Sequence, residues 1–202
     1  GRFLNSWNSL ADLPPWVLTW TPRIVTALFL FAFGASVGSF LNVVAYRLPV
    51  GRSVVSPPSR CPQCGWRLSW HENLPIIGWI LLRGRCRRCR GKISIQYPAI
   101  ELLVAMLFVV TYFAFFWPPR ETWMTEIGGT WWTRSQLAGA WPAYLVMVSL
   151  LSGLVAATLV DARTFLIPAG ITTTMTIVAV GGWLIQGTLA SRIADPTLFP
   201  LP

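Results

Sequence analysis

Residues 24–45 read IVTALFLFAFGASVGSFLNVVA, an apolar run of 22 residues without a charge. A helix of this length extends about 30 Å, which is the thickness of the hydrocarbon core of a bilayer. Gly34, Gly38 and Asn42 recur every four residues along it, so one face of the helix is small or polar. Such a face suits contact with another helix better than contact with lipid. The run therefore predicts a membrane-spanning helix that packs against a neighbour.

The composition of the whole chain agrees with a membrane protein. Of its 202 residues, 54% are hydrophobic and 11% are charged, whereas an ordinary soluble domain has about 25% charged residues. We predict an all-α polytopic membrane protein with about four transmembrane helices and a small cytoplasmic insert that resembles a zinc ribbon. The expected segments are an interfacial N-terminal segment at 1–22, membrane helices at 23–46, 97–117, 137–160 and 171–190, a four-cysteine module at 47–96, an external loop at 118–136, a cytoplasmic loop at 161–170 and a tail at 191–202.

The basic residues decide the predicted orientation. The formal net charge is +9, and ten of the 16 lysines and arginines lie between Arg47 and Lys92. Short loops rich in Lys and Arg stay on the cytoplasmic side of a membrane. We therefore expect the module to be cytoplasmic, and the count of crossings returns Asp161 to the same side.

Two cysteine pairs, Cys61 with Cys64 and Cys86 with Cys89, are separated by 21 residues. Two CxxC knuckles at about this spacing are typical of a tetrahedral zinc site. A closed set of four thiolates leaves no open position for a substrate, so the Zn²⁺ would be structural. Two disulfides are the alternative, which a reducing cytoplasm disfavours. The only histidine, His71, is then expected to be a surface residue and not a ligand.

The arginines around the cysteines have two interpretations. Basic residues at a membrane surface are each attracted to anionic lipid by about 1 kcal/mol. Zinc ribbons with such a cluster can instead bind nucleic acid. Because membrane spans flank the module on both sides, the lipid bilayer is the favoured partner and nucleic acid the weaker interpretation.

Two acidic residues lie near the ends of predicted helices, where a charge at membrane depth needs a reason. Asp161 follows the third span and fits either a catalytic carboxylate or an interfacial or N-cap residue. Glu101 is expected in the first turn of the second span, where the helix dipole stabilises a carboxylate. A structural role for Glu101 is therefore favoured over a catalytic one.

Several motifs together resemble the type IV prepilin peptidase family. They are GSFLNVVAYRLP at 38–49, the two CxxC pairs, NLP at 73–75, RGRC at 83–86 and YPAIELL at 97–103. The resemblance implies a membrane aspartic endopeptidase of the bacterial inner membrane that cleaves the leader peptides of type IV prepilins and type II secretion pseudopilins. Many members of the family also methylate the new N-terminus, so the resemblance makes S-adenosylmethionine an expected cofactor.

Asp161 matches the first of two aspartates that this family uses at the cytoplasmic membrane edge. In such a pair one carboxylate activates water, while the other stays protonated and polarises the peptide carbonyl. The second aspartate belongs to a Gly-x-Gly-Asp motif that does not occur before Pro202, and Asp195 follows the outward-going fourth span. Two hypotheses result. Either the sequence is part of a longer peptidase, or the protein is an inactive relative that serves as a zinc-stapled component of a larger membrane complex.

Overall fold

The computed structural model describes residues 14–117, 131–165 and 168–193 of the chain. Its long helices are α1 (Pro15–Arg47), α3 (Gln96–Phe116), α5 (Trp131–Thr164) and α6 (Ala169–Ile193). All four are long and apolar enough to cross a membrane. The described ranges contain no β-strand. The chain is therefore an all-α, multi-pass membrane protein, as its hydropathy predicted.

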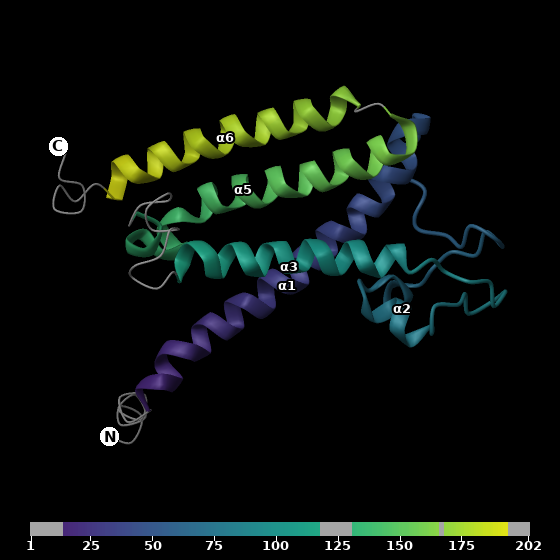
Figure 1. The fold of residues 1–202 in the computed structure, drawn as a ribbon, viewed down its shortest axis with the longest axis horizontal. Helices are drawn as coiled ribbons and strands as arrows, with labels where there is room; N and C mark the ends of the chain where they lie inside the picture. Colours follow the sequence, from purple (N-terminus) through teal and green to yellow (C-terminus); the bar gives the residue numbers. More distant parts are fainter. Residues whose placement is uncertain (1–13, 118–130, 166–167, 194–202) are drawn as a thin grey trace, which may run out of the picture.

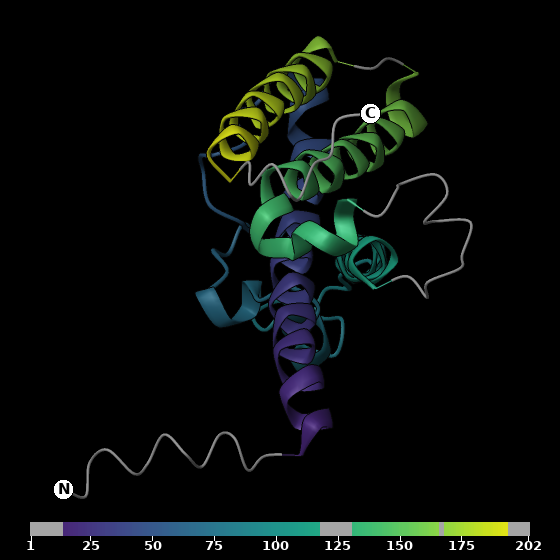
Figure 2. The ribbon, with the colours of Figure 1, turned by 90° about the vertical axis from the view of Figure 1, so that its left-hand side faces the viewer.

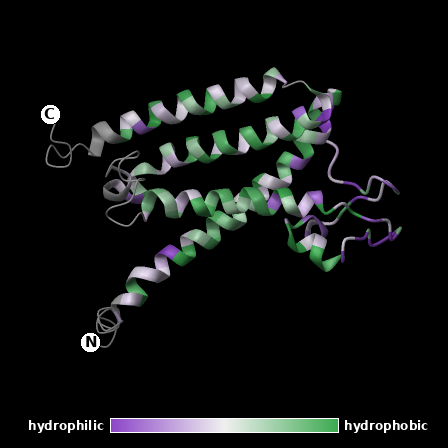
Figure 3. Cartoon of the chain, viewed as in Figure 1, coloured by the Kyte–Doolittle hydropathy of each residue, from purple (hydrophilic) through white to green (hydrophobic). Residues whose placement is uncertain are grey.

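Helices α3, α5 and α6 run in similar directions, and α1 crosses them obliquely (Figure 1). The large angle between α1 and α3 is clearest in Figure 2, where α1 is viewed from the side and α3 almost down its axis. The C-terminal ends of α1 and α5 and the N-terminal ends of α3 and α6 lie at the same end of the bundle. The four-cysteine module, residues 47–96, projects from this end and carries many of the hydrophilic residues (Figure 3). We call it the module end.

The helix bounds differ from the expected ones where a helix continues past its apolar run. Helix α1 begins at Pro15 instead of residue 23, so 15–22 are helical, while 1–13 lie outside the described residues. Its 33 residues extend about 50 Å, which exceeds the hydrocarbon thickness and agrees with the oblique crossing. Helix α5 likewise continues through Thr164, into the stretch expected as a loop at 161–170. Most of the expected external loop and tail, 118–130 and 194–202, lies outside the described residues.

The small face of α1 is its contact with α3, as its four-residue spacing predicted. A methyl group added at Gly34 would lie 2.9 Å from the Cα of Ala105. One added at Gly38 would lie 2.7 Å from the Cα of Glu101. Since real Cβ atoms do not approach backbone so closely, only glycine allows this helix separation.

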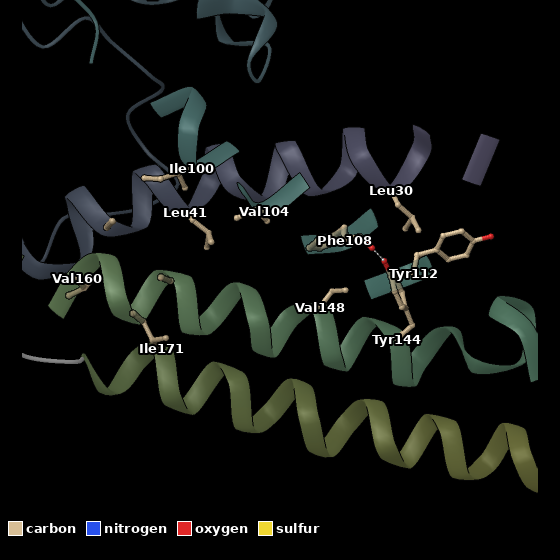
Figure 4. Packing of buried hydrophobic residues seen from close by; sticks show 12 residues of the cluster. Leu30, Leu41, Ile100, Val104, Phe108, Tyr112, Tyr144, Val148, Val160 and Ile171 are labelled. Carbon is tan, nitrogen blue, oxygen red and sulfur yellow. Dashed lines mark hydrogen bonds between the residues drawn. The ribbon is translucent and has the colours of Figure 1, made fainter. Parts of the chain in front are cut away.

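The core of the bundle lies where α1, α3, α5 and α6 converge. It includes the buried side chains of Leu41, Val104, Phe108, Val148, Val160 and Ile171 (Figure 4). The buried Tyr144 hydroxyl on α5 donates a 2.7 Å hydrogen bond to the carbonyl of Phe108 on α3 (Figure 4). A buried phenol in a membrane needs such a partner, so this bond fixes the register of the two helices.

A proline in α5 is accommodated by a side chain from α6. Pro142 lies inside α5 and has no N–H to donate. The buried Gln186 bridges the backbone beside it: its Nε2 donates to the carbonyl of Gly139 at 3.0 Å, and its Oε1 accepts from the N–H of Ala143 at 3.4 Å. Backbone groups at membrane depth have no water to bond, so Gln186 satisfies groups that the proline disturbs.

Candidate metal centre and its surroundings

The four cysteines of the module converge on one point. Their Sγ atoms all lie within 4.8 Å of one another. The Sγ atoms of Cys61 and Cys89 are 3.8 Å apart, and those of Cys64 and Cys86 are 3.9 Å apart. All four are free thiols. A Zn–S bond of about 2.3 Å makes the edge of a tetrahedral four-sulfur site about 3.8 Å, so the donor set fits zinc in both chemistry and size.

The two knuckles repeat one backbone pattern. In each, the first cysteine donates its N–H to a carbonyl five residues later, at 2.9 Å from Cys61 to Trp66 and 2.8 Å from Cys86 to Gly91. The fourth residue after that cysteine adopts a left-handed conformation, which is φ +69° at Gly65 and φ +60° at Arg90. The second knuckle thus places an arginine where the first has glycine, at some cost in strain.

The backbone of the second knuckle stabilises a thiolate. The backbone groups of Cys89 and Arg88 hydrogen-bond to Cys86 and lower the pKa of its thiol to about 7. A backbone hydrogen bond from Gly91 also lowers the pKa of the Cys89 thiol. Desolvation and the hydrogen bonds with the neighbouring thiols outweigh this effect and raise the pKa of Cys89 to about 11. Four thiols this close cannot all ionise without a cation among them. The site is therefore suited to a divalent metal ion.

A buried acidic residue supports the segment between the knuckles. The Ser69 side chain and N–H donate to Glu72 Oε2 at 2.7 Å and 2.9 Å, forming a capping box at the short helix η3 (Trp70–Asn73). These bonds lower the pKa of Glu72 below its ordinary value. Arg87 Nη1 lies 4.0 Å from the other carboxylate oxygen. His71 Nε2 lies 3.2 Å from the Ser69 hydroxyl and is not part of the thiol cluster.

Glu101 joins the module to the membrane bundle. Its carboxylate on α3 accepts a 2.6 Å hydrogen bond from the N–H of Ile76, the residue before the short helix α2 (Ile77–Leu81). Ile76 has φ +62°, an unfavourable value for a β-branched residue. The expectation that Glu101 lies in the first turn is wrong, because α3 begins at Gln96 and places it in the second turn. Its buried carboxylate binds another segment instead of the end of its own helix.

A cavity of about 790 Å³ lies where the module meets α1 and α3. Buried polar side chains line it, among them Asn42, which donates to the carbonyl of Tyr97 at 3.1 Å. Glu72 and Glu101 supply carboxylates, and Trp66 and other residues supply aromatic rings. Cavities of this size and mixed lining commonly bind small molecules. Sequence reasoning missed this cavity, because residues distant in the sequence form it.

Asp161 lies at the module end, in the last turn of α5. It is exposed, and its carbonyl accepts a hydrogen bond from Phe165 at 2.9 Å. The interpretation as an N-cap is wrong, since Asp161 is inside a helix near its C-terminus. The dipole at that end disfavours a negative charge, so helix stability does not explain the carboxylate. The structure brings Asp161 and the module to the same end of the bundle. Asp195 lies outside the described residues.

The fold and the site define a multi-pass membrane protein with a four-cysteine domain between its first two spans. Residues 32–115 match the family model of the bacterial peptidase A24 N-terminal domain, which covers the α1–α3 contact and the whole module. The resemblance to prepilin peptidases is thereby confirmed for the N-terminal part of the chain.

Curated relatives agree with this assignment. A protein of Dickeya chrysanthemi named prepilin leader peptidase/N-methyltransferase is 33% identical over 89% of this chain and 60% of its own length. Proteins of the same name from Klebsiella pneumoniae and Myxococcus xanthus are 36% and 52% identical, over 71% and 45% of this chain and 56% and 27% of their own lengths. The chain thus spans at most 60% of these three relatives. No solved structure matches it.

Proposed function

We propose that this protein cleaves the leader peptides of type IV prepilins and type II secretion pseudopilins, at the cytoplasmic face of the bacterial inner membrane. The observation that carries the proposal is the position of Asp161. This exposed carboxylate lies at the same end of the bundle as the module of the peptidase A24 N-terminal domain. The relatives' names supply the substrate class. The basic module supplies the sidedness, because positive loops remain cytoplasmic.

The proposed chemistry requires a second carboxylate near Asp161. One carboxylate takes a proton from water as its oxygen attacks the scissile carbonyl carbon, while the other, protonated, donates a hydrogen bond to the carbonyl oxygen. Collapse of the tetrahedral intermediate then breaks the C–N bond, and the leaving nitrogen takes up a proton. In their described parts, α5 and α6 carry no other acidic residue. The proposal therefore places the second aspartate outside the described residues.

The module supplies two further parts of the proposal. Zn²⁺ held by Cys61, Cys64, Cys86 and Cys89 would be structural, since four thiolates close its coordination. We infer that the cavity beside it would hold S-adenosylmethionine, which when bound supplies the methyl group for N-methylation. Its amino and sulfonium groups would face the carboxylates of Glu72 and Glu101, and its aromatic adenine would stack on rings of the lining. Its own carboxylate would pair with basic side chains of the same lining, which are Arg47, Arg52, Arg60, Arg87 and Lys92. Binding of radiolabelled S-adenosylmethionine to the purified protein, weakened by Tyr46→Ala on the cavity wall, tests this part without an activity assay.

The decisive experiment is cleavage of a prepilin by the full gene product in membrane vesicles. Asp161→Asn keeps the size of the side chain and removes its charge, and loss of the carboxylate is expected to lower the cleavage rate at least 100-fold. Thr158→Val, at an exposed position one turn earlier on α5, is the matched control and should cleave normally. Equal rates for the Asp161→Asn variant and the wild type would refute the catalytic assignment. Absence of cleavage by both would instead favour an inactive structural subunit in a membrane complex.

A further inference from the structure

Helix α2 starts beside the membrane-spanning helix α3, close to the N-terminal end of α3. The hydrogen bond from Ile76 to Glu101 fixes the start of α2 beside the second turn of α3. Glu101 is five residues beyond the start of α3 at Gln96, which places this contact about 7.5 Å along the spanning helix. Figure 1 shows α2 beside that end of α3. A segment at this depth meets the boundary between headgroups and acyl chains.

The outer face of α2 is apolar and uncovered. Ile77, Ile80 and Leu81 are 54%, 59% and 68% exposed. Their spacing of three and four residues puts them on one face of the helix. Three large aliphatic side chains exposed to water are unfavourable, so this face is suited to contact with lipid.

A cluster of arginines adjoins this apolar face. Arg83, Arg85, Arg87 and Arg90 line a second cavity, of about 720 Å³, together with Leu81 and Glu72. We call it the arginine pocket. In the part of the chain that the structure describes, the only ion pair is between Arg87 and Glu72. Three of the four guanidinium groups therefore lack a carboxylate partner there, and the pocket keeps a positive charge. Guanidinium groups bind phosphate oxygens particularly well.

We propose that α2 and the arginine pocket together bind the headgroup of an anionic phospholipid. The phosphate sits among the arginines, and the acyl chains lie against Ile77, Ile80 and Leu81. Position favours lipid over nucleic acid, because the pocket shares Leu81 with α2, and the start of α2 is hydrogen-bonded to the second turn of a spanning helix. The proposal does not depend on peptidase activity. It accounts for both the charge and the apolar face, which neither free phosphate nor nucleic acid does.

The test measures lipid affinity of the full chain purified in neutral detergent. Phosphatidylglycerol is titrated in and the lipid-bound fraction is read by native mass spectrometry, with phosphatidylcholine for comparison. Arg83→Gln combined with Arg85→Gln is expected to weaken phosphatidylglycerol binding about 30-fold, the size expected for two basic residues at a lipid surface. Arg52→Gln combined with Arg67→Gln removes the same charge outside the arginine pocket and is expected to change binding less than about threefold.

A second variant tests the apolar half of the site. Ile80→Gln combined with Leu81→Gln leaves all charges in place and is also expected to weaken phosphatidylglycerol binding at least about tenfold. Unchanged melting temperatures in neutral detergent establish that each variant is folded. Equal losses in the two arginine pairs would reduce the effect to general electrostatics and overturn the proposal. Competition by glycerol phosphate or by an RNA duplex, or full affinity in the Ile80 and Leu81 variant, would overturn it as well.

Discussion

The contact between Glu101 and Ile76 should hold the module against the bundle, and its removal should release α2. A hydrogen bond from a backbone N–H to a buried carboxylate contributes about 1.5–3 kcal/mol. The left-handed conformation of Ile76 costs about 1–3 kcal/mol, so α2 depends on this bond to keep its start in place. Glu101→Leu is therefore expected to destabilise the docked α2 by about 2 kcal/mol, while Glu101→Gln, which keeps an oxygen acceptor, should lose about 1 kcal/mol.

Hydrogen exchange in nanodiscs measures this release directly. A loss of about 2 kcal/mol should speed exchange in the peptide 74–82 about 30-fold where local opening controls it. Adding Ile76→Gly to Glu101→Leu should recover part of the protection, because glycine adopts φ +62° without strain. Met106→Leu, on the exposed face of α3, is the control and should leave exchange unchanged. Unaltered exchange of peptide 74–82 in Glu101→Leu would refute the reasoning. It would also be refuted if adding Ile76→Gly restored no protection to this peptide while the rest of α3 stayed protected.

Three other predictions concern the metal, the helix contact and the acid response. The purified protein should contain one zinc ion per chain by elemental analysis, and Cys61→Ser or Cys86→Ser should lose it while Ser59→Ala retains it; a metal-free wild type would contradict the four-thiol centre. Gly38→Ala places a methyl group 2.7 Å from the Cα of Glu101 and should lower the free energy of unfolding by about 1–3 kcal/mol. Gly181→Ala, where the added methyl group meets open space, is the control and should be neutral or stabilising. Equal melting temperatures for the two variants would contradict the close contact. Hydrogen bonds lower the pKa of Glu72 in the folded protein below 4.5, so the stabilisation by its carboxylate is complete above pH 4.5 and is lost as the pH falls through the folded pKa. The wild type should therefore lose stability relative to Glu72→Gln as the solution becomes acidic. A difference in stability that stays constant across this pH range would count against the capping box.

The membrane helices could be predicted because local composition determines them. A run such as 24–45 is long and apolar enough to span the lipid, and glycines four residues apart allow another helix to pack closely against it. The paired cysteines were equally informative, since their spacing alone indicates a metal site. The predicted ends of the helices were wrong. Helices α1 and α5 continue past their apolar runs, because polar residues near the interface can remain helical. The predicted position of Glu101 in the first turn was wrong as well, because α3 begins at Gln96.

The cavities and the module contacts could not be predicted, because they depend on tertiary geometry. No local signal marks Ile76 as a left-handed residue or pairs it with a carboxylate 25 residues away. The left-handed residue of the second knuckle could not be predicted either. Gly91 would be expected to adopt this conformation, but the backbone hydrogen bonds of Cys86 give it to Arg90. Gln186, which bridges the backbone beside Pro142, is likewise an ordinary polar residue in the sequence.

The most direct test of the account is the sidedness of Asp161 and the module. Single reporters Asp161→Cys and Arg52→Cys are labelled with a membrane-impermeable thiol reagent, and Trp16→Cys reports the opposite end of the bundle. Mass spectrometry resolves each labelled site from the native cysteines. In inside-out vesicles, positions 161 and 52 should both react and position 16 should not, and right-side-out cells should give the reverse. Labelling of positions 161 and 52 from opposite faces would contradict the proposal that a catalytic carboxylate and the metal module work on one side of the membrane.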